Sequence, residues 1–195
     1  MIDYNELKEL LKSNRSYRRF DNSRPISEDI LRKLVELTRY CASGRNLQPL
    51  RYRIVTSREE CDALYPALKW AGYYEDWDGP VPSERPVAYL VQCIDTKLTN
   101  DCLCDDGIQL EAITLGAATF GIHGVIIKAF NAAQVAAALN LPETYKPRYV
   151  LPLGYPAEEV KLEDTDGTSH ADIRYHRDEA GVHYVPKRPL SELII

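Results

Sequence analysis

The sequence predicts an α+β fold in which a mixed or antiparallel central sheet is flanked by helices. Helical and strand patterns alternate irregularly along the 195 residues, and a hairpin pattern stands near the C-terminus. No G-x-G-x-x-G follows a strand and no G-x-x-x-x-G-K-[ST] occurs, which excludes the common dinucleotide and triphosphate loops as motifs. The length and the hydrophobic content of 45% predict one domain, residues 1–195, with a substantial core.

Capping residues predict where four helices begin. The caps are Asp3, Ser27, Ser57 and Asn131, and three of them are followed three residues later by Glu or Gln. The first helix is expected to end near Ser13 and the last near Leu139. A fifth helix, 105–121, is apolar on most sides and is therefore expected to be buried almost all round, in the core or against a second subunit.

Short apolar and alternating runs predict the strands. The predicted segments are 51–56, 87–94, 124–128, 148–156 and a hairpin over 172–185 that turns at "DEAG". The run 87–94 is mostly apolar, which is typical of a buried central strand. Residues 70–86 hold three prolines and four aromatic side chains without periodicity, so we expect a long loop that lines or covers a site.

Charge and cysteine content limit the possible partners and compartment. The net charge of −5 and the pI near 5.4 argue against a nucleic-acid-binding face. No apolar run is long enough to span a bilayer and the first residues do not resemble a signal peptide, so a cytoplasmic protein without a membrane partner is expected. Five scattered cysteines suit a reducing compartment, and no cysteine or histidine spacing predicts a metal site.

The segment "NRSYRRF", residues 14–20, concentrates positive charge in an acidic chain. Arg15, Arg18 and Arg19 follow directly on the first helix and precede a loop, where their side chains can converge on one anion. The alternative is a solvated turn in which these arginines pair with Asp21 or Glu28. An arginine cluster that binds nucleic acid or an acidic partner is a further alternative.

Five segments taken in order resemble the FMN-dependent nitroreductase-like flavoproteins. They are "RSYRRF", "SGRNLQP", "DDGIQLEAITLGAATFGI", "LGYP" and "VPKRPLSELI", and they extend over nearly the whole chain. The resemblance implies the nitroreductase-like fold and an intertwined homodimer in which each subunit completes the FMN site of the other. An FMN site needs cations at two places, at the phosphate and at the N1/O2 edge of the ring.

The resemblance also implies which residues bind FMN. Arg15 and Ser16 would hold the ribityl and phosphate end, Lys187 and Arg188 would close on the phosphate, and Arg18 would lie toward N1/O2. The other implied cofactor-binding residues are Ser43, Gly44, Asn46 and Gln48, from the partner subunit, and Lys128 and Ala129 at the flavin N5. Many relatives have arginine at the position of Asn14, and Lys187 or Arg19 would compensate. "SGRN" can also be a helix C-cap with a left-handed Gly44.

The implied activity is a ping-pong reaction. NADH or NADPH reduces the flavin, and a nitroaromatic, a quinone or a similar flat acceptor then takes the electrons in the same cleft. The flavin N5 performs the chemistry, with the Ala129 N–H as candidate donor, so no catalytic acid is expected. Four aromatic residues of the 70–86 loop, namely Trp70, Tyr73, Tyr74 and Trp77, would form a wall for a flat substrate. The alternatives are dehalogenation or oxidation on the same fold, and a flavin-binding protein with little turnover.

Overall fold

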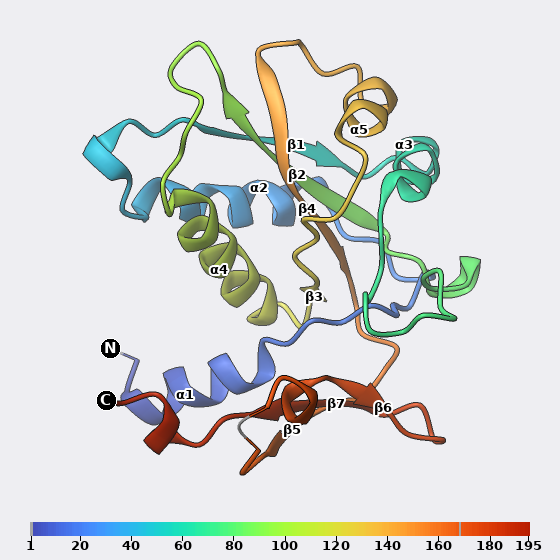
Figure 1. Ribbon diagram of the computed structural model, residues 1–195. Helices are drawn as coiled ribbons and strands as arrows, with labels where there is room; N and C mark the ends of the chain where they lie inside the picture. The colour runs from blue at the N-terminus through green and yellow to red at the C-terminus, as the bar shows by residue number, and fades with distance from the viewer. Residues whose placement is uncertain (1, 168) are drawn as a thin grey trace.

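The computed structural model describes residues 2–167 and 169–195. Its centre is a four-stranded antiparallel sheet in the order β1-β2-β4-β3 (Figure 1). The strands are β1 (Leu50–Val55), β2 (Ala88–Asp95), β3 (His123–Gly124) and β4 (Tyr145–Gly154). The predicted α+β class with an antiparallel central sheet is confirmed.

Helices cover both faces of this sheet (Figure 1). Helices α2 (Glu28–Leu37) and α4 (Asp105–Ala118) lie on one face, and α3 (Arg58–Leu64) and α5 (Ala132–Ala138) lie on the other; α1 (Tyr4–Ser13) packs against α4. Alternate residues of β2 enter two cores: Tyr89 and Val91 pack with α3 and α5, whereas Ala88 and Leu90 pack with α2 and α4. The whole of β2 is buried, as its apolar sequence predicts.

All four predicted helix caps are formed. Asp3 and Glu6 make a reciprocal capping box, and the side chain of Ser27 accepts from the N–H of Ile30. Ser57 and Asn131 accept from the third residue of their helices at 3.2 and 3.1 Å. A cap satisfies backbone donors that the helix itself leaves unpaired, so the helix starts follow from local sequence.

Two strands differ from their predicted bounds by more than one residue. The segment expected as a strand over 124–128 is a two-residue strand, after which Ile127 alone bridges Val150. Strand β4 begins at Tyr145, before the predicted 148, and its register against β2 shifts where Cys93 lies opposite Pro147. A proline cannot donate to the ladder, which is consistent with an irregularity at that point.

Helix α4 is not enclosed by its own chain. Leu110, Ile113 and Ala117 are buried under α2 and the sheet, but Ile108 is exposed, as is Phe120 just after the helix. Burial almost all round within one chain is therefore a wrong prediction, and the alternative of a second subunit on this helix stays open.

The C-terminal part forms a second, three-stranded sheet below the main one (Figure 1). Its strands are β5 (Val160–Asp164), β6 (His176–Arg177) and β7 (His183–Lys187), in the order β5-β7-β6. Strands β6 and β7 form the predicted hairpin, and Gly181 in its turn has a φ of 86°. The parallel pairing of β5 with β7 has no counterpart in the prediction. No helix in the described residues is long and apolar enough to cross a membrane.

Candidate functional site

The arginine segment 14–20 leaves α1 and runs along the edge of the main sheet. The Tyr17 N–H donates to the Gly124 carbonyl at 3.0 Å, and Ser16 forms a parallel bridge with the same glycine. Phe20 is fully buried and packs on Gly154, where an added Cβ would lie 2.7 Å from the phenylalanine side chain. The backbone that carries the arginines is therefore fixed at both ends.

A buried carboxylate organises this segment from the far end of the chain. Glu158 has a side chain that is 2% exposed, and it accepts hydrogen bonds from the backbone N–H groups of Arg18 and Arg19. It also accepts from Arg177 Nη2 at 2.8 Å. One carboxylate thus joins the arginine segment to strand β6, and no sequence pattern pointed to it.

The side chain of Arg18 is itself buried, at 8% exposure. Its Nη1 donates to the Ser16 carbonyl and lies 3.2 Å from Nε2 of His183. A guanidinium can only donate, so Nε2 must accept and the imidazole proton stands on Nδ1, 2.5 Å from the Tyr74 hydroxyl. Burial, Arg18 and Arg177 lower the pKa of His183 to about 4, which keeps this histidine neutral at pH 7.

Arg18 faces a cavity of about 280 Å³, here called the ring cavity. Its walls are Arg18, Lys69 to Gly72, Val125 to Ala129, and Tyr175. The Lys69 N–H donates to the Ala129 carbonyl at 2.9 Å, so the two backbone walls are joined. The structure therefore brings together three of the predicted site residues, Arg18, Lys128 and Ala129.

Arg15 and Lys187, two of the residues that were predicted to bind the phosphate, lie near each other. Partial burial lowers the pKa of Lys187, and the charge of nearby Arg15 lowers it further. Two cations held close together favour an anion between them. Ser16 lies beside Arg15 on the same segment. Arg188 instead acts on Asp172: hydrogen bonds from Ser169 are the main cause that lowers the pKa of Asp172, and the charge of Arg188 lowers it further.

Asn14 contacts helix α4. Its Nδ2 donates to the Thr114 hydroxyl at 2.9 Å and lies 3.3 Å from Glu111 Oε1. This contact ties the end of α1 to α4. The amide is directed at the helix, so Asn14 does not extend the Arg15 and Lys187 pair.

The loop of residues 43–48 lies away from the ring cavity, at the opposite end of the main sheet (Figure 1). Ser43 Oγ and the Gly44 N–H donate to Asp105, at the start of α4. A left-handed Gly44 is wrong: positive φ values occur instead at Arg45, Asn46 and Gln48 (53°, 56° and 48°). Such strain in three non-glycine residues marks a loop that its surroundings hold firmly. Within one chain, Ser43, Gly44, Asn46 and Gln48 do not meet Arg18.

The aromatic residues of the 70–86 loop divide between two places. Trp70 lines the ring cavity. Tyr73 and Tyr74 line an adjoining groove of about 540 Å³, here called the outer groove, together with Ala171 and Arg174 to Arg177. Tyr175 belongs to both and packs on Tyr74 with ring centres 5.3 Å apart. Trp77 lines neither, and it packs edge-on against Tyr74.

The hairpin was predicted, but its contribution to the site was not. His183 and Tyr175 alternate with polar residues in "DIRYHRDEAGVHYV", and an alternating strand with an inward histidine was the only available signal. The two histidines of the hairpin do not face each other, because His176 lies opposite Tyr184 and His183 lies opposite Arg177.

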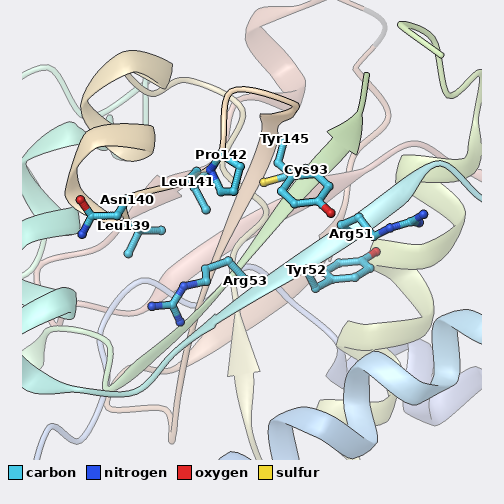
Figure 2. A pocket seen from close by; sticks show the side chains of 9 residues that line it. All are labelled: Arg51, Tyr52, Arg53, Cys93, Leu139, Asn140, Leu141, Pro142 and Tyr145. Atoms are coloured by element: carbon cyan, nitrogen blue, oxygen red, sulfur yellow. The ribbon is translucent and has the colours of Figure 1, made fainter. Parts of the chain in front are cut away.

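A separate cavity of about 340 Å³ lies on the α5 side of the main sheet (Figure 2). It is bordered by Arg51 and Arg53 of β1, and Cys93 contributes to its wall. Both arginines already pair with acids, Asp95 and Glu60. Burial raises the pKa of Cys93 to about 12, which leaves an unreactive thiol. This cavity holds none of the predicted site residues.

Known proteins that are similar to this chain in sequence or in fold are nitroreductases. The Nitroreductase family model matches residues 11–101, which include the arginine segment, the 43–48 loop and β2. A nitroreductase family protein of Clostridium difficile 630 has a TM-score of 0.65 at 20% identity, over 96% of this chain and 95% of its own. An FMN-dependent nitroreductase of Clostridium difficile R20291 has a TM-score of 0.64 at 18% identity, over 84% and 92%.

A curated relative agrees with these structures. A Methanothermobacter thermautotrophicus protein, provisionally named NADH dehydrogenase/NAD(P)H nitroreductase, is 24% identical over 162 residues, 80% of each chain. The fold is that of nitroreductase structures, and the sequence of this chain resembles the Nitroreductase family over residues 11–101.

Proposed function

We propose that the protein is an FMN-dependent oxidoreductase that uses NADH or NADPH to reduce flat acceptors such as nitroaromatics or quinones. The observation that carries this proposal is the placement of cations at two points of one fixed segment. Arg18 faces the ring cavity, while Arg15 lies near Lys187. The name of the Clostridium difficile R20291 neighbour supports FMN, and that of the Methanothermobacter relative supports NAD(P)H.

The residues present suit FMN at both of its ends. Arg15, Ser16 and Lys187 would hold the phosphate, with Arg188 beside them in sequence. Arg18 would offset the charge that reduction places on the N1/O2 edge, and the backbone at Ala129, with Lys128, would border N5. Bound FMN would supply the redox chemistry by taking a hydride and passing electrons to the acceptor.

The chain itself would bind, orient and shield. Glu158 fixes the backbone of Arg18, and His183 fixes its side chain, so the guanidinium is held in one place before a ligand arrives. Trp70 and Tyr175 supply aromatic walls against which a flat molecule can pack and which exclude water. No titrating side chain is required at the reacting atom.

We further propose that the working form is a homodimer. An apolar groove of about 380 Å³ between α1, the end of α2 and α4 includes Leu10, Leu37, Tyr40 and Leu115. Exposed apolar surface of this kind favours a partner. A second copy there would also explain how Ser43, Gly44, Asn46 and Gln48 serve the site, since they lie far from Arg18 in their own chain.

The decisive experiment is an absorbance spectrum of the purified protein, followed by mass spectrometry of the released chromophore. FMN is the expected result, and NADH or NADPH should then be oxidised when nitroaromatic or quinone acceptors are added. FAD, or no flavin after reconstitution with excess FMN, would refute the proposal. Bound FMN without turnover on any acceptor would identify a flavin-binding protein and refute the enzymatic part.

A further inference from the structure

The charged side chains on the ring cavity and the outer groove all have one sign. The ring cavity has Arg18, Lys69 and Lys128 on its walls, and the outer groove has Arg174 and Arg177 beside the imidazole of His176. Neither lining includes an aspartate or a glutamate. Because acidic residues outnumber basic ones by 29 to 24 in the whole chain, this local excess of positive charge is not a consequence of composition.

Apart from Arg18, which contacts the Ser16 carbonyl and His183, three of these cations have no acidic partner in the described residues. Arg177 pairs with Glu158, and His176 lies 3.7 Å from Glu163. Lys69, Lys128 and Arg174 take part in none of the ion pairs found within 2–167 and 169–195. Their charges are thus available to a ligand.

Aromatic rings accompany these cations. Arg174 stands over the Tyr73 ring at 4.7 Å, and Lys128 stands over the Tyr149 ring at 4.6 Å with its Nζ 3.2 Å from the hydroxyl. Trp70 and Tyr175 complete the walls. The ring cavity and the outer groove share Tyr175. Their aromatic rings and unpaired cations are complementary to a ligand with a flat ring and a negative group.

We propose that the ring cavity and the outer groove together select substrates with a flat ring and an anionic group. The anionic group is a carboxylate, a sulfonate or a phosphate. The inference rests on the proposed oxidoreductase function and narrows its substrate class. The anion has two possible sources, a carboxylated or sulfonated acceptor and the 2′-phosphate that distinguishes NADPH from NADH. Lys69, Lys128 and Arg174 are assigned as specificity-determining residues.

The test compares ratios, so that changes common to all substrates cancel. With flavin-loaded protein, kcat/KM is measured for 4-nitrobenzoate against neutral 4-nitrobenzamide, and separately for NADPH against NADH. The variants are Lys69→Gln, Arg174→Gln and Lys128→Gln, each with its flavin content determined. Lys146→Gln is the matched control, because Lys146 is an exposed lysine of β4 outside both cavities.

Each cavity variant is expected to lower one of the two ratios by about twofold to fivefold, as for a partly exposed ion pair. The loss should shrink between about 0.02 and 0.5 M salt, because screening weakens such attraction. A change in the acceptor ratio assigns the anion to the acceptor, and a change in the NADPH ratio assigns it to the donor. Both ratios unchanged in all three variants, or an equal change in Lys146→Gln, would overturn the inference.

A binding measurement separates this inference from the proposed function. Isothermal titration of the protein with 4-nitrobenzoate and with 4-nitrobenzamide needs no turnover. If neither acceptor is reduced but the anion binds more tightly and Lys69→Gln removes the difference, the oxidoreductase proposal fails while the anion site stands. Equal affinities for the two compounds, together with equal affinities for NADPH and NADH, in an active enzyme would refute the anion site alone.

Discussion

Replacing Glu158 by glutamine should destabilise the protein strongly, because this carboxylate joins three elements. It accepts from the N–H groups of Arg18 and Arg19 and from Arg177 Nη2, and its side chain is 2% exposed. Glutamine keeps the shape but presents its NH₂ group to donors and leaves the mostly buried Arg177 guanidinium without a counter-charge. Breaking such a pair costs about 3–5 kcal/mol of unfolding free energy.

A thermal unfolding scan measures the effect. In a protein of this size 1 kcal/mol corresponds to about 2–4 °C, so the lower figure predicts a fall in Tm of about 6–12 °C. Glu159→Gln is the adjacent control: its side chain is 58% exposed and pairs only with Lys161 at the surface, so a change within about 0.5 kcal/mol is expected. Amide hydrogen exchange at Arg18 and Arg19 should accelerate in the Glu158 variant.

A double variant tests whether the buried charge is the cause. Removing both charges, as in Glu158→Gln with Arg177→Met, should recover part of the lost stability, because no uncompensated charge then remains. Equal Tm values for the Glu158 and Glu159 variants would refute the reasoning, as would additive losses in the double variant.

Three further predictions follow from the same contacts. Arg18→Ala should lower the two-electron midpoint potential of bound FMN by about 30–65 mV, since a hydrogen bond to a charged group contributes about 1.5–3 kcal/mol. Spectroelectrochemistry measures this potential. An unchanged potential with intact FMN binding would place Arg18 away from the flavin ring. The folded-state pKa of His183 is depressed to about 4 from 6.5, so the unfolded chain binds more protons between these values and stability should fall as pH decreases from about 6.5 to 4. The Tm of His183→Gln should depend less on pH in that window. Equal slopes of Tm against pH for this variant and the unaltered protein would contradict the assignment. Ala112→Glu, on the apolar groove, should split or aggregate the dimer and release FMN, whereas Ala137→Glu, on the exposed face of α5, should not. Light scattering measures the oligomeric state. A monodisperse Ala112→Glu dimer would exclude the apolar groove as the interface.

The sequence predicted what depends on neighbours along the chain. The caps at Asp3, Ser57 and Asn131 act within three residues, and the buried strand β2 is apparent from its own composition. The partners of Arg18 could not be predicted in this way. Glu158 and His183 are 140 and 165 residues away, and neither a single carboxylate in a loop nor a single histidine in a strand carries a pattern that identifies its partner.

Helix α4 and the 43–48 loop show a different limit. Apolar residues on most sides of α4 predict that this helix is buried, but composition does not say whether the burying surface belongs to the same chain or to a second subunit. Ala117 is fully buried against its own sheet, whereas Ala112 and Leu115 face the groove. Likewise, the loop required left-handed backbone, yet it takes this conformation at Arg45, Asn46 and Gln48 and not at Gly44.

The small C-terminal sheet and the residues just before it border the ring cavity and also hold Arg18 in position. The backbone of Arg18 is held by Glu158, just before β5, and its side chain is held by His183, in β7. A guanidinium fixed by two buried partners has already lost its rotamer freedom before a ligand binds, so less entropy is lost on binding. Substitutions in β5 to β7 should consequently weaken ligand binding while the main sheet, whose two cores contain none of these residues, stays folded.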